Sequence, residues 1–157
     1  MSWSRRSFLA APLALAACGF TPVYAPGGTA SKLQNRVKVS EQNSREGYLL
    51  LRRFEERLGR ADTPSFDLRF NLSSSTAGLA IDPAGDVERF DLIATLHYEL
   101  WSLETGQLLT KGSVDDFTGY SASGSTVATQ AAERDARERL MTILADEVVV
   151  RLHATEL

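Results

Sequence analysis

Hydrophobic and polar residues alternate along four segments of the chain, and each such segment predicts a half-buried β-strand. The segments cover residues 33–40, 66–72, 88–103 and 107–117. In the third and longest segment, apolar side chains occupy every second position from Phe90 to Leu100. A turn over residues 104–107, with Gly106 at a left-handed position, joins it to the fourth segment as a hairpin.

Two further segments carry apolar residues at helical spacing. Leu50, Phe54 and Leu58 recur every four residues, which predicts a helix over about 44–58 that is capped by Asn43 or Ser44 and ends at Gly59. A second helix is predicted over about 126–153, with Ser125 as its cap. Its apolar ladder comprises Ala132, Ala136, Leu140, Leu144 and Val148, flanked by Ile143 and Leu152.

The order β-α-β-β-β-α predicts an α+β fold, a two-layer sandwich with two helices on one face of a four-stranded, mostly antiparallel sheet. The other face of the sheet is then uncovered. It is expected to carry Arg36, Lys38, Arg69, Ile93, His97, Trp101 and Lys111. Ile93 and Trp101 are either isolated exposed residues, or inward-facing residues of a shifted register, or part of a surface for a partner. Residues 73–86 predict a long polar connection, either functional or the tip of an extended hairpin.

The first residues predict an export signal. Arg5 and Arg6 precede a short apolar stretch at 8–17, and Cys18, the single cysteine of the chain, follows. We therefore expect a signal peptide at 1–17, a lipidated tether at 18–31 and a single domain at 32–157. The alternatives are a buried helix and a buried, unmodified cysteine.

Two known signals resemble this segment. The sequence Leu15-Ala16-Ala17-Cys18 is similar to the lipobox of bacterial lipoproteins, which implies that acyl chains such as palmitate are attached at Cys18 and anchor the protein to a membrane. The sequence around Arg5 and Arg6 also resembles the twin-arginine export motif. The general secretory and twin-arginine routes both stay open.

Composition excludes several classes of protein. The 157 residues carry a net charge of −3, which does not favour nucleic-acid binding, and no apolar run is long enough to span a bilayer. One cysteine and two histidines exclude a zinc cage or a disulfide framework within the chain. Acidic residues between 82 and 91 lack the spacing of a calcium loop, and no nucleophile stands beside a base. We expect no enzyme, no metal and no cofactor.

A set of short motifs in order along the chain resembles the LptE family of lipopolysaccharide-assembly lipoproteins, in its alphaproteobacterial branch. The motifs are Cys18-Gly19-Phe20, Pro22-Val23-Tyr24, Arg89-Phe90, Tyr98-Glu99-Leu100, Thr105-Gly106, Ala132-Glu133-Arg134-Asp135-Ala136, Arg139-Leu140, Leu144-Ala145-Asp146 and Arg151-Leu152. The resemblance implies a non-enzymatic lipoprotein on the periplasmic side of the outer membrane. It would plug and help assemble the β-barrel LptD, and the pair would deliver lipopolysaccharide to the outer leaflet. The alternatives are a lipoprotein subunit of an envelope lipid ABC-transport complex and a peptidoglycan- or scaffold-binding lipoprotein.

Candidate contact residues follow from chemistry. The phosphates of lipopolysaccharide favour basic side chains on strands or at loop tips, and the candidates are Arg36, Lys38, Arg69, Arg89 and Lys111, each of which could instead be a solvated residue of the sheet. The candidate barrel contacts are Leu79, Ile81, Ile93 and Trp101. We expect the polar connection at 73–88 to enter the lumen of the barrel.

Overall fold

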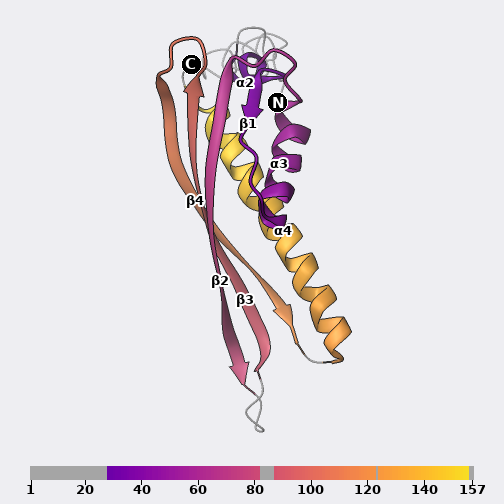
Figure 1. The fold of residues 1–157 in the computed structure, drawn as a ribbon. Helices are drawn as coiled ribbons and strands as arrows, with labels where there is room; N and C mark the ends of the chain where they lie inside the picture. The colour runs from indigo at the N-terminus through magenta and orange to yellow at the C-terminus, as the bar shows by residue number, and fades with distance from the viewer. Residues whose placement is uncertain (1–27, 82–86, 123, 156–157) are drawn as a thin grey trace, which may run out of the picture.

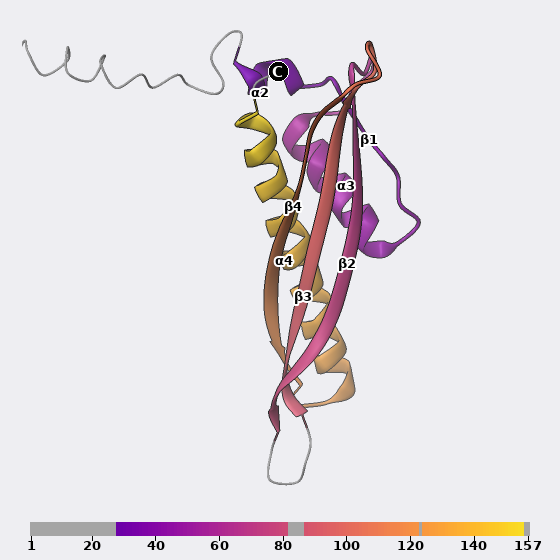
Figure 2. The same ribbon diagram turned by 90° about the vertical axis from the view of Figure 1, so that its left-hand side faces the viewer.

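A four-stranded sheet is covered by helices on one face and open on the other (Figures 1 and 2). The computed structural model describes residues 28–81, 87–122 and 124–155. The elements are α2 (Thr29–Leu33), β1 (Val37–Val39), α3 (Arg45–Leu58), β2 (Phe66–Ile81), β3 (Val87–Ser102), β4 (Leu108–Ser121) and α4 (Thr126–His153). The predicted α+β class and the order β-α-β-β-β-α are confirmed, and the short helix α2 precedes them. Within the described residues, no helix is long and apolar enough to cross a membrane.

The sheet follows the order of the chain, β1-β2-β3-β4. The short strand β1 is parallel to β2, while β2, β3 and β4 form a long antiparallel ribbon. The predicted hairpin between β3 and β4 is confirmed, with φ of Gly106 at 68°. A helix of 28 residues rises about 42 Å at 1.5 Å per residue, and α4 uses this length to run along the ribbon (Figure 2).

The core lies between the helices and one face of the sheet. Leu68, Leu96 and Leu100, at even-numbered positions of β2 and β3, point toward the helices and are fully buried. The helices supply Leu50, Phe54, Leu140, Leu144, Val148 and Leu152. The apolar side chains on every second residue of the strands therefore pack against the apolar face of the helices, which repeats every 3.6 residues. One layer of helices is enough to bury the apolar face of the sheet.

Both predicted helix starts are confirmed by hydrogen bonds. The Ser44 hydroxyl accepts from the backbone N–H of Gly47 at 2.9 Å, which selects Ser44 over Asn43 as the cap of α3. The Ser125 hydroxyl accepts from the N–H of Ala128 at 3.3 Å. Helix α3 ends at Gly59, whose φ of 76° is open to glycine and rare for other residues.

The predicted first strand is wrong at its start. Leu33 belongs to α2 rather than to a strand, and only Val37–Val39 pair with β2. The alternation at 33–40 is misleading because Leu33 is buried by a helical turn, and Asn35 then takes a positive φ of 57° that breaks any extended path.

Of the two alternatives for 73–86, the described residues support the extended hairpin, because β2 continues to Ile81 and pairs with β3. The predicted strand end at 72 is therefore nine residues too early. Ser73, Ser74, Ser75 and Thr76 lie in register with β3 and all four are exposed, so their side chains give no alternation of buried and exposed positions. Likewise, β4 extends to Ser121, beyond the predicted end at 117. Residues 82–86, which include Asp82 and Asp86, lie outside the described residues. Ile143, expected beside the core, is exposed because it faces away from the sheet.

Candidate ligand and partner surface

The uncovered face of the sheet, called the open face below, is built from odd-numbered residues of β2, β3 and β4. Pairing places Arg69 and Lys111 on either side of Glu99, and Asn71 and Ser113 on either side of His97. The side chains on this face come from strands whose other side is fixed in the core. The sequence prediction that Lys38, Arg69, Ile93, His97, Trp101 and Lys111 share this face agrees with this register.

Several side-chain contacts on the open face meet at Arg69. Its Nε donates to Asp67 Oδ2 at 2.8 Å, and its guanidinium carbon lies 5.1 Å from the centre of the Trp101 ring. The Trp101 indole N–H donates in turn to Glu99 Oε2 at 3.0 Å. We call Lys38, Asp67, Arg69, Glu99, Trp101 and Lys111 the Arg69 cluster. Stacking and ion pairing together hold the guanidinium in one orientation.

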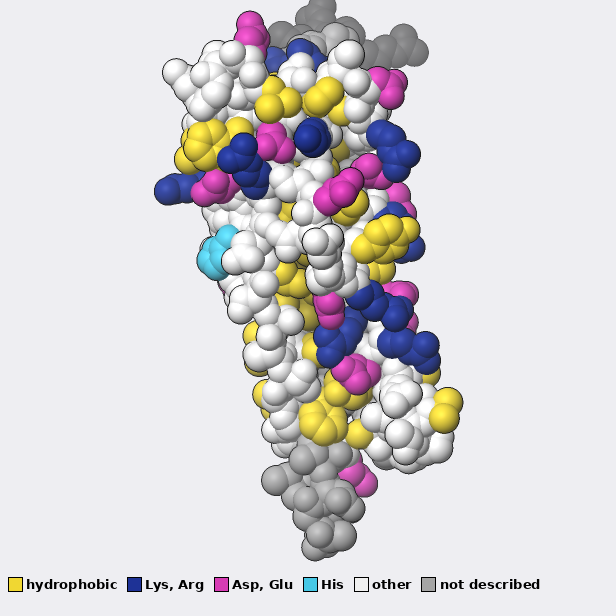
Figure 3. Space-filling view, in the orientation of Figure 1, with side chains coloured by type: hydrophobic (Ala, Val, Ile, Leu, Met, Phe, Trp, Pro, Cys, Tyr) yellow, Lys and Arg dark blue, Asp and Glu magenta, His cyan; other side chains and the backbone are white. Residues whose placement is uncertain are grey.

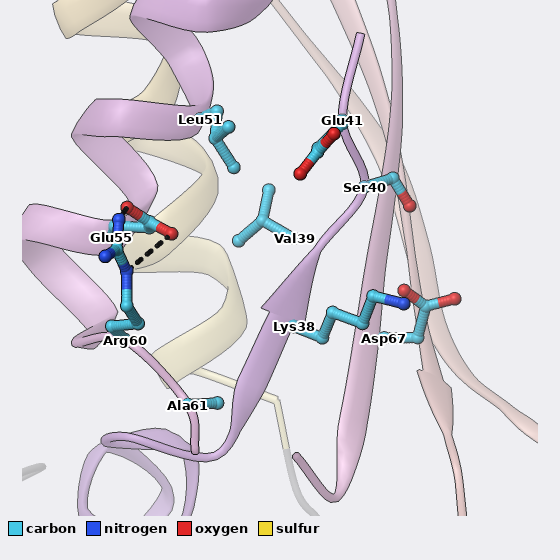
Figure 4. A pocket seen from close by; sticks show the side chains of 9 residues that line it. All are labelled: Lys38, Val39, Ser40, Glu41, Leu51, Glu55, Arg60, Ala61 and Asp67. Atoms are coloured by element: carbon cyan, nitrogen blue, oxygen red, sulfur yellow. Dashed lines mark hydrogen bonds and ion pairs between the residues drawn. The ribbon is translucent and has the colours of Figure 1, made fainter. Parts of the chain in front are cut away.

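A pocket of about 560 Å³ adjoins the cluster between α3 and β1, and shares Lys38 and Asp67 with it (Figure 4). Across the pocket, Arg60 Nη2 lies 2.8 Å from Glu55 Oε2. The hydrogen bond to Glu55 raises the pKa of Arg60, since it stabilises the charged guanidinium. Three carboxylates, those of Glu41, Glu55 and Asp67, line the pocket with two cations. The mixed charge suits a polar ligand and gives no concentrated site for phosphate.

Two of the five predicted phosphate-binding residues lie away from the Arg69 cluster. Arg36 precedes β1, donates to Ser65 Oγ at 2.8 Å and lies 5.9 Å from the Phe66 ring centre. Arg36 therefore lies beside Ser65 and Phe66 at the end of the sheet, outside the Arg69 cluster. Arg89 lies near the start of β3, at the end of the sheet away from the Arg69 cluster. Its side chain lies over Gly119 of β4, since its Nη2 is 3.4 Å from the position that a Cβ on Gly119 would take.

The predicted barrel contacts also separate into two groups. Ile93 is 44% exposed and is paired with Phe117, which is 61% exposed, while Trp101 belongs to the Arg69 cluster. Asp91, Asp115 and Asp116 line an open pocket of about 370 Å³ together with Ile93 and Phe117. Phe117 was not among the predicted contacts. Counting outward from a turn at 104–107 would set Thr118 opposite Ile93. The register shift between Leu100 and Trp101 brings Phe117 there instead, and the sequence carries no signal for that shift.

Leu79 and Ile81 lie at the distal end of β2, where pairing with β3 becomes irregular. Leu79 is 57% exposed. The Ile81 side chain falls outside what the structure describes. The position of Leu79 places one apolar side chain in solvent beside the hairpin tip, which is compatible with contact to a partner.

The two histidines do not form a pair. His97 is exposed on the open face, whereas His153 is at the end of α4, on the helix side of the sheet. Burial lowers the pKa of His153, and the nearby Arg57 lowers it further. Among the residues that the structure describes, no three His, Cys, Asp or Glu side chains are grouped as metal ligands.

Comparison with known proteins gives one family and several solved structures. A family model described as "LptE: Lipopolysaccharide-assembly" matches residues 33–152. A putative lipoprotein from Caulobacter crescentus has a similar structure, with a TM-score of 0.67 and 22% identity, over 82% of this chain and 95% of that one.

Two further solved structures are similar at lower identity. Rare lipoprotein B from Shewanella oneidensis has a TM-score of 0.57 and 14% identity over 76% of this chain and 92% of its own. A minor lipoprotein from Acinetobacter baumannii has a TM-score of 0.54 and 12% identity over 76% and 89% of the two chains. No curated protein matches the chain. At these identities the solved structures establish a shared fold.

Proposed function

The chain belongs to the LptE family of lipopolysaccharide-assembly proteins, and on that premise we propose that it joins the outer-membrane β-barrel LptD, helps it assemble and acts with it in delivering lipopolysaccharide to the outer leaflet. The family consists of non-enzymatic assembly factors, so the chain is not an enzyme. The proposed location is the periplasmic side of the outer membrane, with an acyl anchor on Cys18, a residue outside those that the structure describes.

The observation that carries the lipopolysaccharide part of the proposal is the Arg69 cluster. Lipopolysaccharide combines phosphate groups with acyl chains. Asp67 occupies the Nε edge of Arg69, and within the described residues this leaves the two Nη groups for a phosphate. Trp101 beneath the guanidinium offers apolar surface beside the charge, and Lys111 lies across Glu99. An oriented guanidinium next to an aromatic ring suits an amphipathic anion.

Substitution of Arg69 tests this site. We expect Arg69→Ala to weaken the binding of purified lipopolysaccharide to the purified lipoprotein by about tenfold, since a charge-assisted contact contributes about 1.5–3 kcal/mol. The matched control is Arg134→Ala, because Arg134 is exposed on α4 and its Nε donates to the Gln130 carbonyl of its own helix. Equal binding by the two variants would reject the Arg69 cluster as the binding site.

Affinity capture tests the barrel partner. After crosslinking in cells, the lipoprotein isolated from detergent-solubilised outer membrane is expected to bring LptD with it. Recovery of an ABC-transport assembly instead would replace the proposal with the envelope lipid-transport alternative.

The hairpin tip and the Ile93–Phe117 pair are the proposed barrel contacts. Deletion of residues 77–86 removes Leu79 and Ile81 and is expected to reduce capture of LptD. Phe117→Ser is expected to do the same through the exposed pair on the open face. Val127→Ser, at an exposed position on the first turn of α4, is the control. Unchanged capture by both altered proteins would show that neither surface meets the barrel.

A further inference from the structure

The sheet has two edges, and they differ in how their backbone groups are used. Along β2, strand β1 pairs only with Phe66–Leu68. Two more contacts follow: the Ser40 N–H donates to the Leu68 carbonyl at 2.9 Å, and Gln42 Nε2 donates to the Phe70 carbonyl at 2.6 Å. Beyond Phe70, no described element runs beside this edge of β2 (Figures 1 and 2).

The direction of the backbone groups follows from this pairing. Successive residues of a strand direct their N–H and C=O groups alternately to the two sides. Since Phe66 and Leu68 use theirs toward β1, the even-numbered residues Leu72, Ser74 and Thr76 direct theirs outward. The odd-numbered residues between them pair with β3. The edge therefore presents an ordered row of free donors and acceptors.

The opposite edge, on β4, is protected by side chains. The Phe117 N–H donates to Asp116 Oδ1 at 2.7 Å, and the Ser113 carbonyl accepts from Arg151 of α4. Lys111, Asp115 and Asp116 add charges along the same strand, and charged side chains discourage pairing with another strand. These contacts leave β4 poorly suited to accept a further strand.

Residues 71–78 of β2 have none of these protective features. Their sequence, Asn-Leu-Ser-Ser-Ser-Thr-Ala-Gly, contains no charged residue and no proline. Ser73, Ser74, Ser75 and Thr76 are all exposed, on both faces of the sheet. The helices leave this part of β2 uncovered because α4 packs mainly on β4 and α3 packs mainly on α4. In Figure 3 the lower length of β2 is a largely uncharged surface. An uncharged edge with free backbone groups is the geometry used in recognition by strand addition.

We propose that the β2 edge over residues 71–78 binds an extended segment of a partner protein as a fifth strand of the sheet. An anionic lipid is a poor occupant because this segment carries no cation. A second copy of the chain is also a poor occupant. Antiparallel self-pairing would set serine, alanine and glycine against one another, with Leu72 as the one large apolar side chain, and stable dimers need a larger apolar area.

The identity of the partner rests on the proposed function, in which it is the barrel protein. Strands of a closed barrel have no free edge. The added strand therefore comes from a loop or a chain end of that partner. The edge would bind the partner segment mainly through backbone hydrogen bonds, which do not depend on side chains. Many sequences are therefore expected to fit, provided that their side chains pack beside the small residues of this edge.

Residue-resolved hydrogen exchange on the free lipoprotein and on the captured complex tests strand addition. In the free protein, the amides of Leu72, Ser74 and Thr76 should exchange fast, and those of Ser73 and Ser75 slowly. In the complex, the three outward amides should slow by at least about tenfold, while the inward ones stay slow. If a partner is captured and the outward amides still exchange at their free rates, the proposal is overturned and the proposed function stands.

A proline pair gives an independent test in the full chain. Ser74→Pro removes one outward N–H without breaking a bond to β3, and proline is tolerated at such edge positions. We expect about tenfold less captured partner. Ser113→Pro makes the same change at an outward position of β4 and should capture as much as the unmodified chain. Equal capture by both variants, or outward amides protected in a dimer of this chain alone, would overturn the proposal. Failure to capture any barrel protein would count against the proposed function instead.

Discussion

At the scale of single residues, Gly59 is the position where the fold depends most on the absence of a side chain. Its φ of 76° is unfavourable for other residues, and a Cβ there would collide with the Asn35 side-chain oxygen. We expect Gly59→Ala to lower the free energy of unfolding by at least about 2 kcal/mol, because strain and collision add.

The matched control for Gly59 is Gly106→Ala in the hairpin turn. Its φ is also positive, at 68°, but nothing lies within 4 Å of the added Cβ. The expected cost is about 1 kcal/mol from strain alone. Urea unfolding of both variants separates the two effects, and equal costs would show that the contact with Asn35 is relieved by movement.

His153 gives a pH dependence of stability. Its folded-state pKa is lowered by burial and by Arg57, so below about pH 6.5 the unfolded chain binds more protons than the folded one. The free energy of unfolding should therefore fall as pH decreases from about 6.5 through the lowered value, and His153 should have no effect at higher pH. Unfolding curves of His153→Gln should lose this part of the decline.

The control for His153 is His97→Gln, because the His97 side chain is exposed on the open face. Its unfolding curves should keep the acid-dependent decline of the unmodified chain. A decline that is identical in all three proteins would assign the effect to other groups.

At the scale of elements, the contact between α3 and α4 depends on an ion pair that is only partly exposed. Arg53 donates to both carboxylate oxygens of Asp146, at 2.9 and 2.7 Å, and these bonds raise the pKa of Arg53. We expect Arg53→Met to lower the free energy of unfolding by about 1 kcal/mol. Arg52→Met breaks only an exposed pair with Glu56 within α3 and should change it by less than about 0.5 kcal/mol, as measured by thermal unfolding.

The sequence predicts elements well wherever an element buries one side. Phe54 and Leu140 mark helices, and Leu96 marks a strand, because each is buried at the period of its element. Ser73–Thr76 carry no such signal, since both faces of β2 are exposed there and backbone pairing alone keeps the strand. This segment, which the sequence misjudges, is also the one whose outer edge no described strand covers.

The candidate site is predictable only in part, for a related reason. Parity along strands places Arg69, Trp101 and Lys111 on one face, but it does not show that Arg69 stacks on Trp101. Arg36 lies between Asn35, whose φ is positive, and the start of β1, so strand alternation does not give the position of its side chain. The parity of residues along a strand can be counted from the sequence, whereas a register shift such as the one between Leu100 and Trp101 cannot.

At the scale of the whole molecule, the described helices and strands form a long, narrow body, and the proposed sites lie at different points along it (Figure 1). The Arg69 cluster lies beside β1, and the free β2 edge and the Ile93–Phe117 pair lie toward the distal half. The proposed lipid-binding surface and the proposed protein-binding edge can then be occupied together. Arg69→Ala should leave capture of the barrel unchanged, and Ser74→Pro should leave lipopolysaccharide binding unchanged.

Two attachments, an acyl anchor and a protein partner, are proposed to hold the molecule at the membrane, and Cys18→Ser separates them. The substitution should abolish incorporation of radiolabelled palmitate, since Cys18 is the only cysteine. Each buried CH₂ of an acyl chain contributes about 0.8 kcal/mol, so the unlipidated chain should leave membranes that lack LptD. In membranes that contain LptD it should still be captured, because the proposed contacts lie within residues 66–121. Loss of capture despite a native circular dichroism spectrum would show that the anchor itself is part of the recognition.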